Sequence, residues 1–168
     1  MDYFPKLDLS LLQLVYLISN IMIKQRDGFH GERAVVLPPA IIQEMENDPI
    51  SAILHITDIG YYPKAWHHFR ERKDPITQYI FIYCTEGEGW YKVNGEEFHV
   101  SANQYFILPA GCSHSYGAND ENPWTIYWIH FKGKLAPHFA KQCLRPIEIN
   151  PNIHSRITNR ANMFQEIL

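Results

Sequence analysis

Short runs of apolar residues dominate the middle of the chain and are broken at roughly even intervals by glycine, proline and asparagine. These runs are rich in aromatic and β-branched residues, which favour strands. On this pattern, strands are predicted over residues 52–62, 77–87, 90–93, 97–100, 104–108 and 124–131. Strands spaced in this way, with turn residues between them, predict a barrel or a double sheet rather than a βαβ fold.

The N-terminal segment carries a different pattern. Residues 9–23 read LSLLQLVYLISNIMI, contain no charged side chain and predict a helix that begins at Asp8 or Ser10 as its N-cap. The segment is shorter than the roughly 20 residues that span a membrane, and no signal-peptide cleavage site follows it. It is therefore expected either to pack on its own domain or to pair two subunits.

The remaining segments complete the predicted domain plan. The other predicted elements are a loop over 26–49 with a short helix at 41–46, a helix over 137–144, an edge strand over 144–151 and a final helix from Ile153. We expect an N-terminal helix and arm over residues 1–50, a β domain over 51–133 and a C-terminal helical segment over 134–168. The chain ends within its last helical pattern, without a cap.

Charge argues against a nucleic-acid surface on these residues. The formal net charge is −3, and phosphate binding needs clustered lysine and arginine. The largest basic cluster is Arg70, Arg72 and Lys73, which Glu71 and Asp74 interrupt. These 168 residues are therefore not expected to bind DNA by themselves.

The cysteines indicate a reducing compartment. The chain contains three cysteines, an odd number: Cys84, Cys112 and Cys143. They are widely spaced, and none of them forms a CxxC pair. This pattern is neither a disulfide framework nor a zinc site, and it favours the cytoplasm.

Nine histidines raise the question of a metal-dependent enzyme. Metal-binding cupins use an H-x-H pair on one strand, a following glutamate and a histidine on a later strand. His114 completes a P-x-G-x-x-H motif that begins at Pro109, but residues 82–85 (IYCT) stand where the H-x-H pair would be. We expect no metal, no cofactor and no catalytic residue, although a sugar isomerase or dioxygenase of the cupin kind stays the alternative. The pair His67 and His68 is expected at the surface.

Four side chains are candidates for a ligand pocket: Arg72, His114, Tyr116 and Trp128. Aromatic faces stack on the C–H patches of sugars, and arginine donates to hydroxyl groups. A carbohydrate-binding module without a regulatory role is a third possibility.

An ordered set of motifs makes the prediction more specific. The segment EGEGWYKVNGEEFHVSANQYFILPAGCSHSYG, followed by WTIYWIHFKG, resembles the regulatory domain of AraC-family transcription regulators. The shared features are a G-x-G turn, a hairpin, a strand ending in P-x-G-x-x-H-x-Y and a closing W-x-x-x-W-x-x-F strand. The resemblance is strongest over residues 56–133 and extends into the helical tail.

The resemblance implies a mainly β fold, a cupin-like jelly-roll barrel with an N-terminal helix and C-terminal helices. It implies a small-molecule effector, often a carbohydrate, and a homodimer in the full-length bacterial regulator. DNA would be bound only through a helix-turn-helix domain that is absent from these 168 residues. No membrane partner is expected.

The resemblance also implies individual site residues. Arg72, Tyr116 and Trp128 match positions that sugar-sensing members use to contact the effector. The chain departs from the family at Ile126, where those members carry a histidine, so the same sugar specificity is not implied. Residues 28–33 (GFHGER) are the expected counterpart of the family's effector-gripping arm.

Overall fold

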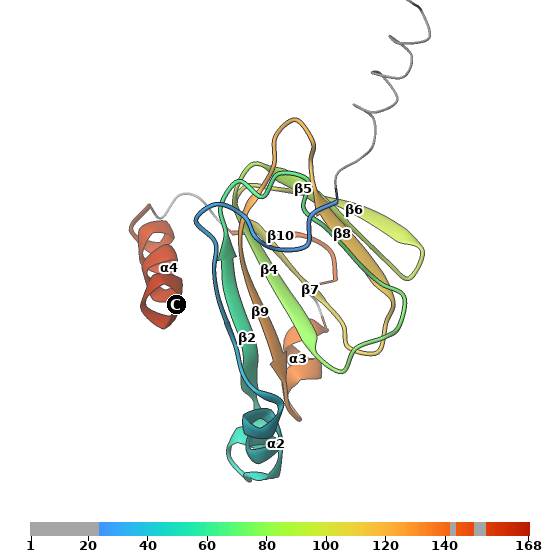
Figure 1. The fold of residues 1–168 in the computed structure, drawn as a ribbon, viewed down its shortest axis with the longest axis vertical. Helices are drawn as coiled ribbons and strands as arrows, with labels where there is room; N and C mark the ends of the chain where they lie inside the picture. Colours follow the sequence, from blue (N-terminus) through green and yellow to red (C-terminus); the bar gives the residue numbers. More distant parts are fainter. Residues whose placement is uncertain (1–23, 142–143, 150–153) are drawn as a thin grey trace, which may run out of the picture.

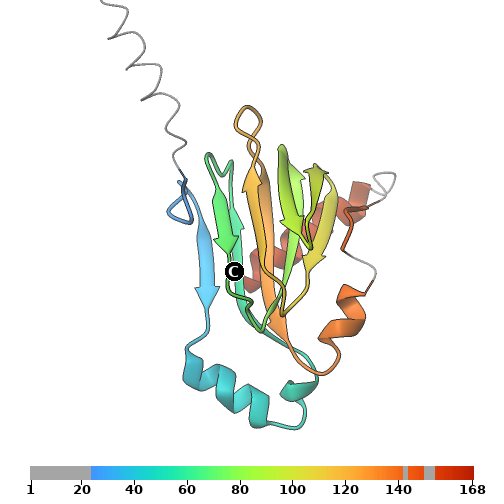
Figure 2. The same cartoon turned by 90° about the vertical axis from the view of Figure 1, so that its right-hand side faces the viewer.

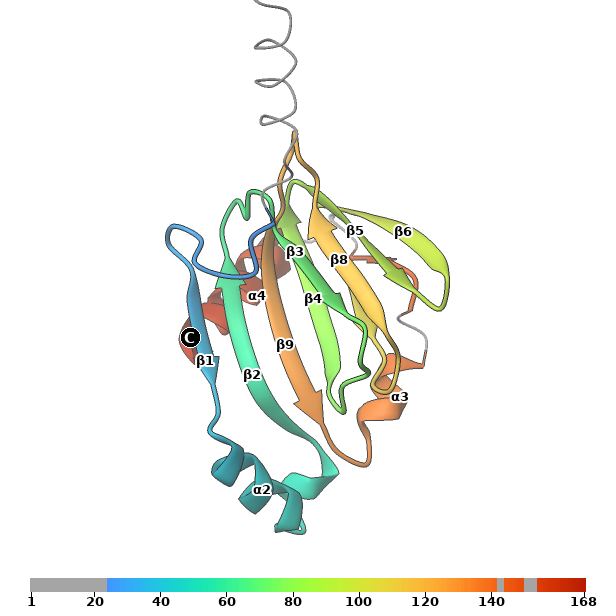
Figure 3. The same ribbon diagram turned by 45° about the vertical axis from the view of Figure 1, so that its right-hand side comes forward.

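A computed structural model of the chain describes residues 24–141, 144–149 and 154–168. Within these ranges, two antiparallel sheets face each other and enclose the core (Figure 1, Figure 3). The predicted helix over residues 9–23, as well as Cys143, lies outside the described residues. No helix in the described ranges is long and apolar enough to cross a membrane.

The larger sheet has six strands and the smaller sheet has four. In spatial order the larger sheet contains β1 (Arg33–Val36), β2 (His55–Tyr62), β9 (Thr125–Lys132), β4 (Tyr79–Glu86), β7 (Gln104–Leu108) and β10 (Ile147–Glu148). The smaller sheet contains β3 (Phe69–Arg72), β8 (His114–Ala118), β5 (Glu88–Val93) and β6 (Glu96–Ser101). The chain passes repeatedly between the sheets, as in a jelly roll.

This arrangement confirms the predicted mainly β, cupin-like jelly roll. The strands of the two sheets do not pair with each other within the described part of the chain, so the barrel is not closed by hydrogen bonds. Residues 33–36, predicted as loop, form the edge strand β1. The larger sheet thus takes β1 and β10 from outside the predicted range of 51–133.

Every second side chain of the strands points between the two sheets, and these side chains form the core. Tyr91 of β5 stacks on Phe106 of β7, with ring centroids 3.9 Å apart and planes 6° apart. Ile80, Ile82 and Cys84 of β4 are fully buried in the same cluster. Because alternate residues of a strand face the same side, the residues between them lie on the outer face of the larger sheet.

The G-x-G turn and the closing tryptophan depend on each other. Gly87 has a φ of +70°, a conformation that other residues rarely adopt. A Cβ on Gly89 would lie 2.0 Å from the ring of Trp124, which is fully buried. The second glycine of the motif therefore provides the space that the tryptophan just before β9 occupies.

In the described part of the chain, the sheets are flanked by α2 (Pro39–Asn47), the 3₁₀ turn η1 (Ser51–Ile53), α3 (Ala136–Ala140) and α4 (His154–Ile167). The last of these lies against the outer face of the larger sheet (Figure 2). Phe164 stacks there on Tyr127, with 4.5 Å between ring centroids, and also on Phe81 and Tyr83. Helix α4 is thereby joined to strands whose other face forms the interior.

Candidate functional site

A small cavity lies between the two sheets and combines aromatic with polar walls. Its lining residues are Tyr62, His68, Arg70, Ile82, Tyr116, Ile126, Trp128 and His130. The cavity volume is about 20 Å³, which is enough for one water molecule. A larger ligand therefore requires side chains to move.

A wider hollow lies at the ends of β3, β5 and β8. Its volume is about 380 Å³, within the usual range for small-molecule pockets. Its lining residues are Glu71, Arg72, Lys73, Lys92, Val93, Asn94, Gly95, Ser113, His114 and Ser115. Three of its side chains are cationic and one is acidic, so the hollow carries positive charge.

The four residues expected from the sequence divide between these two spaces. Arg72 and His114 line the hollow, and Tyr116 and Trp128 line the cavity. Nη1 of Arg72 donates to the hydroxyl of Tyr116 over 3.2 Å, and the His114 ring stacks near Tyr116 at a centroid distance of 6.1 Å. The smaller sheet thus brings three of the four together, while Trp128 projects from β9 of the opposite sheet.

Glycine at position 60 determines where the Trp128 ring lies. Gly60 pairs with Trp128 across β2 and β9, and a Cβ on Gly60 would lie 2.3 Å from the indole. The ring therefore occupies the space over β2, where it also meets Tyr62 edge to face at 5.4 Å. Two aromatic rings at the cavity wall form a surface on which a ligand can stack.

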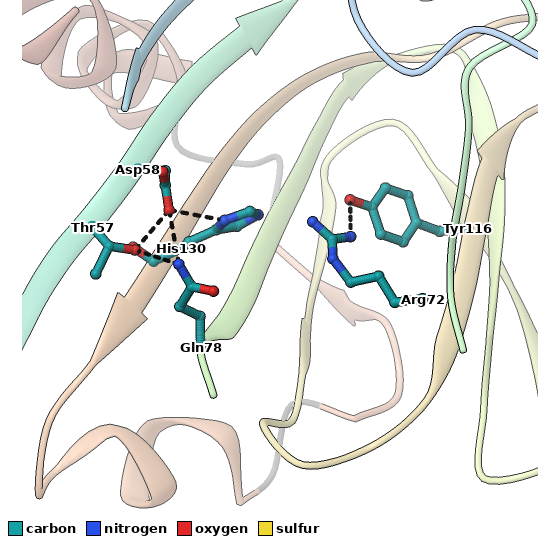
Figure 4. Close-up of polar contacts among 6 residues, drawn as sticks. All are labelled: Thr57, Asp58, Arg72, Gln78, Tyr116 and His130. Atoms are coloured by element: carbon teal, nitrogen blue, oxygen red, sulfur yellow. Dashed lines mark hydrogen bonds and ion pairs between the residues drawn. The ribbon is translucent and has the colours of Figure 1, made fainter. Parts of the chain in front are cut away.

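A buried carboxylate faces Arg72 from the larger sheet, and local sequence spacing did not predict it. Oδ2 of Asp58 accepts hydrogen bonds from Thr57 (2.7 Å), Gln78 (3.1 Å) and Nδ1 of His130 (3.0 Å). Figure 4 shows this cluster on one side and the Arg72–Tyr116 pair on the other. Burial raises the pKa of Asp58, but hydrogen bonds from His130 and Thr57 and the charge of Arg72 bring the pKa below its usual value.

His68 is buried, so its predicted surface position was wrong, whereas His67 beside it is half exposed. His67 adopts a φ of +59°, which turns the chain so that the next side chain points inward. Nδ1 of His68 accepts a hydrogen bond from the indole N–H of Trp124 over 3.1 Å. Burial, together with the charges of Arg70 and Arg72, lowers the pKa of His68 to about 3, so the ring is neutral at pH 7.

Several buried polar atoms around the two spaces have no hydrogen-bond partner within the described ranges. They are Nε2 of His68, Nη1 of Arg70, Nε2 of His114 and Nε1 of Trp128. Leaving one such group unpaired costs about 1–3 kcal/mol, and buried polar groups in proteins are nearly always paired. His68, Arg70 and Trp128 line the cavity and His114 lines the hollow, where the polar groups of a ligand could pair with these atoms.

The expected arm segment lies at this cavity. Phe29 is 7% exposed and packs on Tyr62 and His68, at ring-centroid distances of 4.9 and 5.2 Å. The carboxylate of Glu32 accepts hydrogen bonds from the backbone N–H groups of Gly28 and Phe29. These bonds hold the turn between Gly28 and Glu32 in place.

The same residues do not form a cluster of metal ligands. In the described part of the chain, no three His, Cys, Asp or Glu side chains gather in a way that could hold a metal ion. Nδ1 of His114 lies 3.0 Å from the backbone carbonyl of Cys112, which orients the ring. The donor set of the cavity suits an organic ligand better than a cation.

Comparison with known proteins gives the family. The AraC-like ligand binding domain family model matches residues 59–167. The chain is 38% identical over 106 residues to the MmsAB operon regulatory protein of Pseudomonas aeruginosa, covering 60% of this chain and 34% of that protein. It is 36% identical over 59 residues to the lactose operon transcription activator of Staphylococcus xylosus, covering 35% of this chain and 21% of the activator.

The solved structure of YhaK from Escherichia coli shares the fold. Its TM-score is 0.51 at 15% identity, over 75% of this chain and 57% of YhaK. Both of these curated relatives carry the names of operon regulators. The family match covers most of the β sandwich together with α4, and the chain therefore belongs to the AraC-like ligand binding domain family.

Proposed function

We propose that this chain is the effector-sensing domain of a bacterial transcription regulator and that the effector binds between the two sheets. The observation that carries the proposal is the gathering of unpaired buried polar atoms at a cavity with aromatic walls. Arg72, His114, Tyr116 and Trp128 are the proposed effector-binding residues.

A carbohydrate or a related small molecule is the proposed effector. Trp128 and Tyr62 provide rings for stacking, and Arg72 provides a donor for oxygen atoms. Ile126 is fully buried in the cavity wall and cannot make the hydrogen bond of the histidine that it replaces. The effector is therefore expected to differ from those of members that carry this histidine.

The proposed signal passes from the cavity to α4 through adjacent residues of β9. Trp128 lines the cavity, whereas Tyr127 beside it stacks on Phe164 of α4 and accepts a 2.5 Å hydrogen bond from Gln165. Gln165 also accepts a hydrogen bond from Arg33, where the arm segment enters β1. Effector binding would shift the population between arrangements of arm and helix.

In the full-length regulator, a homodimer and a separate DNA-binding domain are proposed to complete the system in the cytoplasm. The matched curated relatives are three to five times longer than the segment they share with this chain, which spans 34% and 21% of them. Control of DNA binding is thus proposed as a property of the whole regulator, and these 168 residues should bind no DNA.

A thermal-shift screen with mono- and oligosaccharides tests the proposal, because a ligand that binds only the native state raises the melting temperature. Arg72→Ala and Trp128→Ala should abolish the shift, while the matched controls Arg26→Ala and Trp66→Ala, at exposed positions, should retain it. Circular dichroism establishes that each variant is folded. A shift that survives both site variants, or that Trp66→Ala abolishes, contradicts the proposed site.

A further inference from the structure

We propose that the effector carries a carboxylate, as in a sugar acid or a small hydroxy acid, and that His68 and Arg70 bind this group. The inference rests on the proposed function and deepens it, because it names the chemical class of the effector. Neither residue belongs to the positions that the sequence resemblance implied. Both residues line the cavity, and each carries a buried nitrogen atom without a partner in the described ranges.

The hydrogen bond from Trp124 determines which nitrogen of His68 carries the proton. An indole N–H can only donate, so Nδ1 of His68 must act as the acceptor in their 3.1 Å contact. A neutral imidazole with an accepting Nδ1 has its proton on Nε2. Nε2 is the buried atom without a partner, and His68 therefore offers the cavity a donor.

Arg70 and Trp128 supply further donors at the same cavity. Nη1 of Arg70 and Nε1 of Trp128 are buried and unpaired among the described residues. Guanidinium and indole groups have no acceptor atoms. Together with His68, they form a wall of three donors. A carboxylate has two oxygen atoms that only accept hydrogen bonds, so it can pair with such a wall and also supply negative charge.

Charge at the cavity favours an anion over a neutral sugar. No carboxylate lines the cavity. In the described part of the chain, neither Arg70 nor Arg72 lies within 4.0 Å of an acidic group. Arg70 and Arg72 are partly buried, and among the described residues only Arg72 has a carboxylate, that of Asp58, acting on it at longer range from the opposite sheet. Arginine binds carboxylates through strong, charge-assisted hydrogen bonds, so a carboxylate on the effector would give Arg70 a partner of opposite charge.

His114 indicates a hydroxyl group on the same effector. A backbone carbonyl only accepts, so the 3.0 Å contact with Cys112 places a proton on Nδ1 of His114. Burial lowers the pKa of His114, and its buried Nε2 is then an acceptor without a donor among the described residues. A ligand hydroxyl can donate to this atom, while the carboxylate lies toward Arg70. Because the cavity holds only about 20 Å³, such a ligand must displace the Arg72–Tyr116 pair.

Isothermal titration calorimetry on the 168-residue chain tests this inference with matched probes. The probes are D-galacturonate, D-galactose and D-galactose 6-phosphate, with 3-hydroxybutyrate and 1,3-butanediol as a second acid and its neutral counterpart. At least one acid should bind about tenfold or more tightly than its neutral counterpart, which is the effect of one charge-assisted contact.

Variants separate the carboxylate contact from general stability. Arg70→Met should weaken acid binding about tenfold or more and lower the ratio of acid to neutral affinity by a similar factor, whereas Arg26→Met should change neither the acid affinity nor this ratio. His68→Gln keeps both an acceptor for Trp124 and a donor, and it should retain more of the preference for the acid than His68→Phe.

These experiments distinguish failure of the carboxylate inference from failure of the proposed function. If a neutral sugar binds as well as its acid, the carboxylate inference is overturned, but the effector-sensing proposal stands. If only the phosphate ester binds, the cavity is an anion site, but the assignment of a carboxylate to the effector is wrong. If no acid binds, or if Arg70→Met leaves the preference intact, the assignment to His68 and Arg70 is overturned.

Discussion

Replacing His68 by glutamine should make the stability of the domain less sensitive to acid. The native structure keeps this ring neutral, because burial and the nearby Arg70 and Arg72 lower its pKa from 6.5 to about 3. The unfolded chain binds a proton at position 68 more readily than the native protein does. The contribution of His68 is therefore fully present above pH 6.5 and is lost progressively as the pH falls below it.

The size of the effect follows from linkage. For one group with a pKa of 6.5 in the unfolded chain and about 3 in the native protein, the free energy of unfolding falls by about 1.4 kcal/mol between pH 7.5 and pH 5.5. The pKa of His114 is also lowered by burial, which adds a loss of the same sign. Asp58, whose usual pKa is 3.8 and is lowered here, titrates below this window.

Urea unfolding at pH 7.5, 6.5 and 5.5 measures the slope. The glutamine variant can still accept the hydrogen bond from Trp124, and its loss between pH 7.5 and 5.5 should be about 1.4 kcal/mol smaller than that of the parent chain. His99→Gln is the matched control, because the His99 side chain is 85% exposed, and it should keep the parent slope. An unchanged slope in His68→Gln would refute the assignment of a neutral, buried imidazole.

Two further predictions concern packing. Gly60→Ala places a Cβ about 2.3 Å from the Trp128 ring, and it should cost about 1–3 kcal/mol in urea unfolding. Asparagine tolerates the positive φ at position 95, and a side chain there would meet open space, so Gly95→Asn should cost less. Equal costs for the two variants would contradict the close packing of Gly60 against Trp128. Phe164→Ala removes a ring stacked on the larger sheet, so amide hydrogen exchange in α4 should quicken about tenfold for each 1.4 kcal/mol of lost packing. The same change at Met163, which is 62% exposed, should have little effect, and identical exchange in both variants would argue against docking of α4 through Phe164.

Strands with strong local signals were predictable from the sequence. β4, β5, β6, β7 and β9 combine aromatic or β-branched residues with glycine, proline or asparagine at their ends. The ordered G-x-G and tryptophan motifs indicated the family, and the contact between Gly89 and Trp124 gives them a packing reason. The four candidate site residues could be named because they occupy motif positions.

Other parts of the site left no local signal. β3 reads FRER, and charged residues normally predict solvent, yet Arg70 lines the cavity because the opposite sheet covers β3. β8 reads HSYGA and lacks β-branched residues. Asp58 and His130 are 72 residues apart, and only the pairing of β2 with β9 brings them into contact. Such contacts depend on strand register, which spacing within one strand does not reveal.

The central claim is that the effector binds between the two sheets. A crystal structure of the domain with the tightest ligand from the sugar and sugar-acid screens tests it most directly. The account predicts ligand density in the cavity, in contact with Tyr116 and Trp128 and with Arg72 moved from its present hydrogen bond. Density only in the separate apolar groove lined by Phe81, Ile129 and Phe139, or near the exposed Trp66, would contradict it.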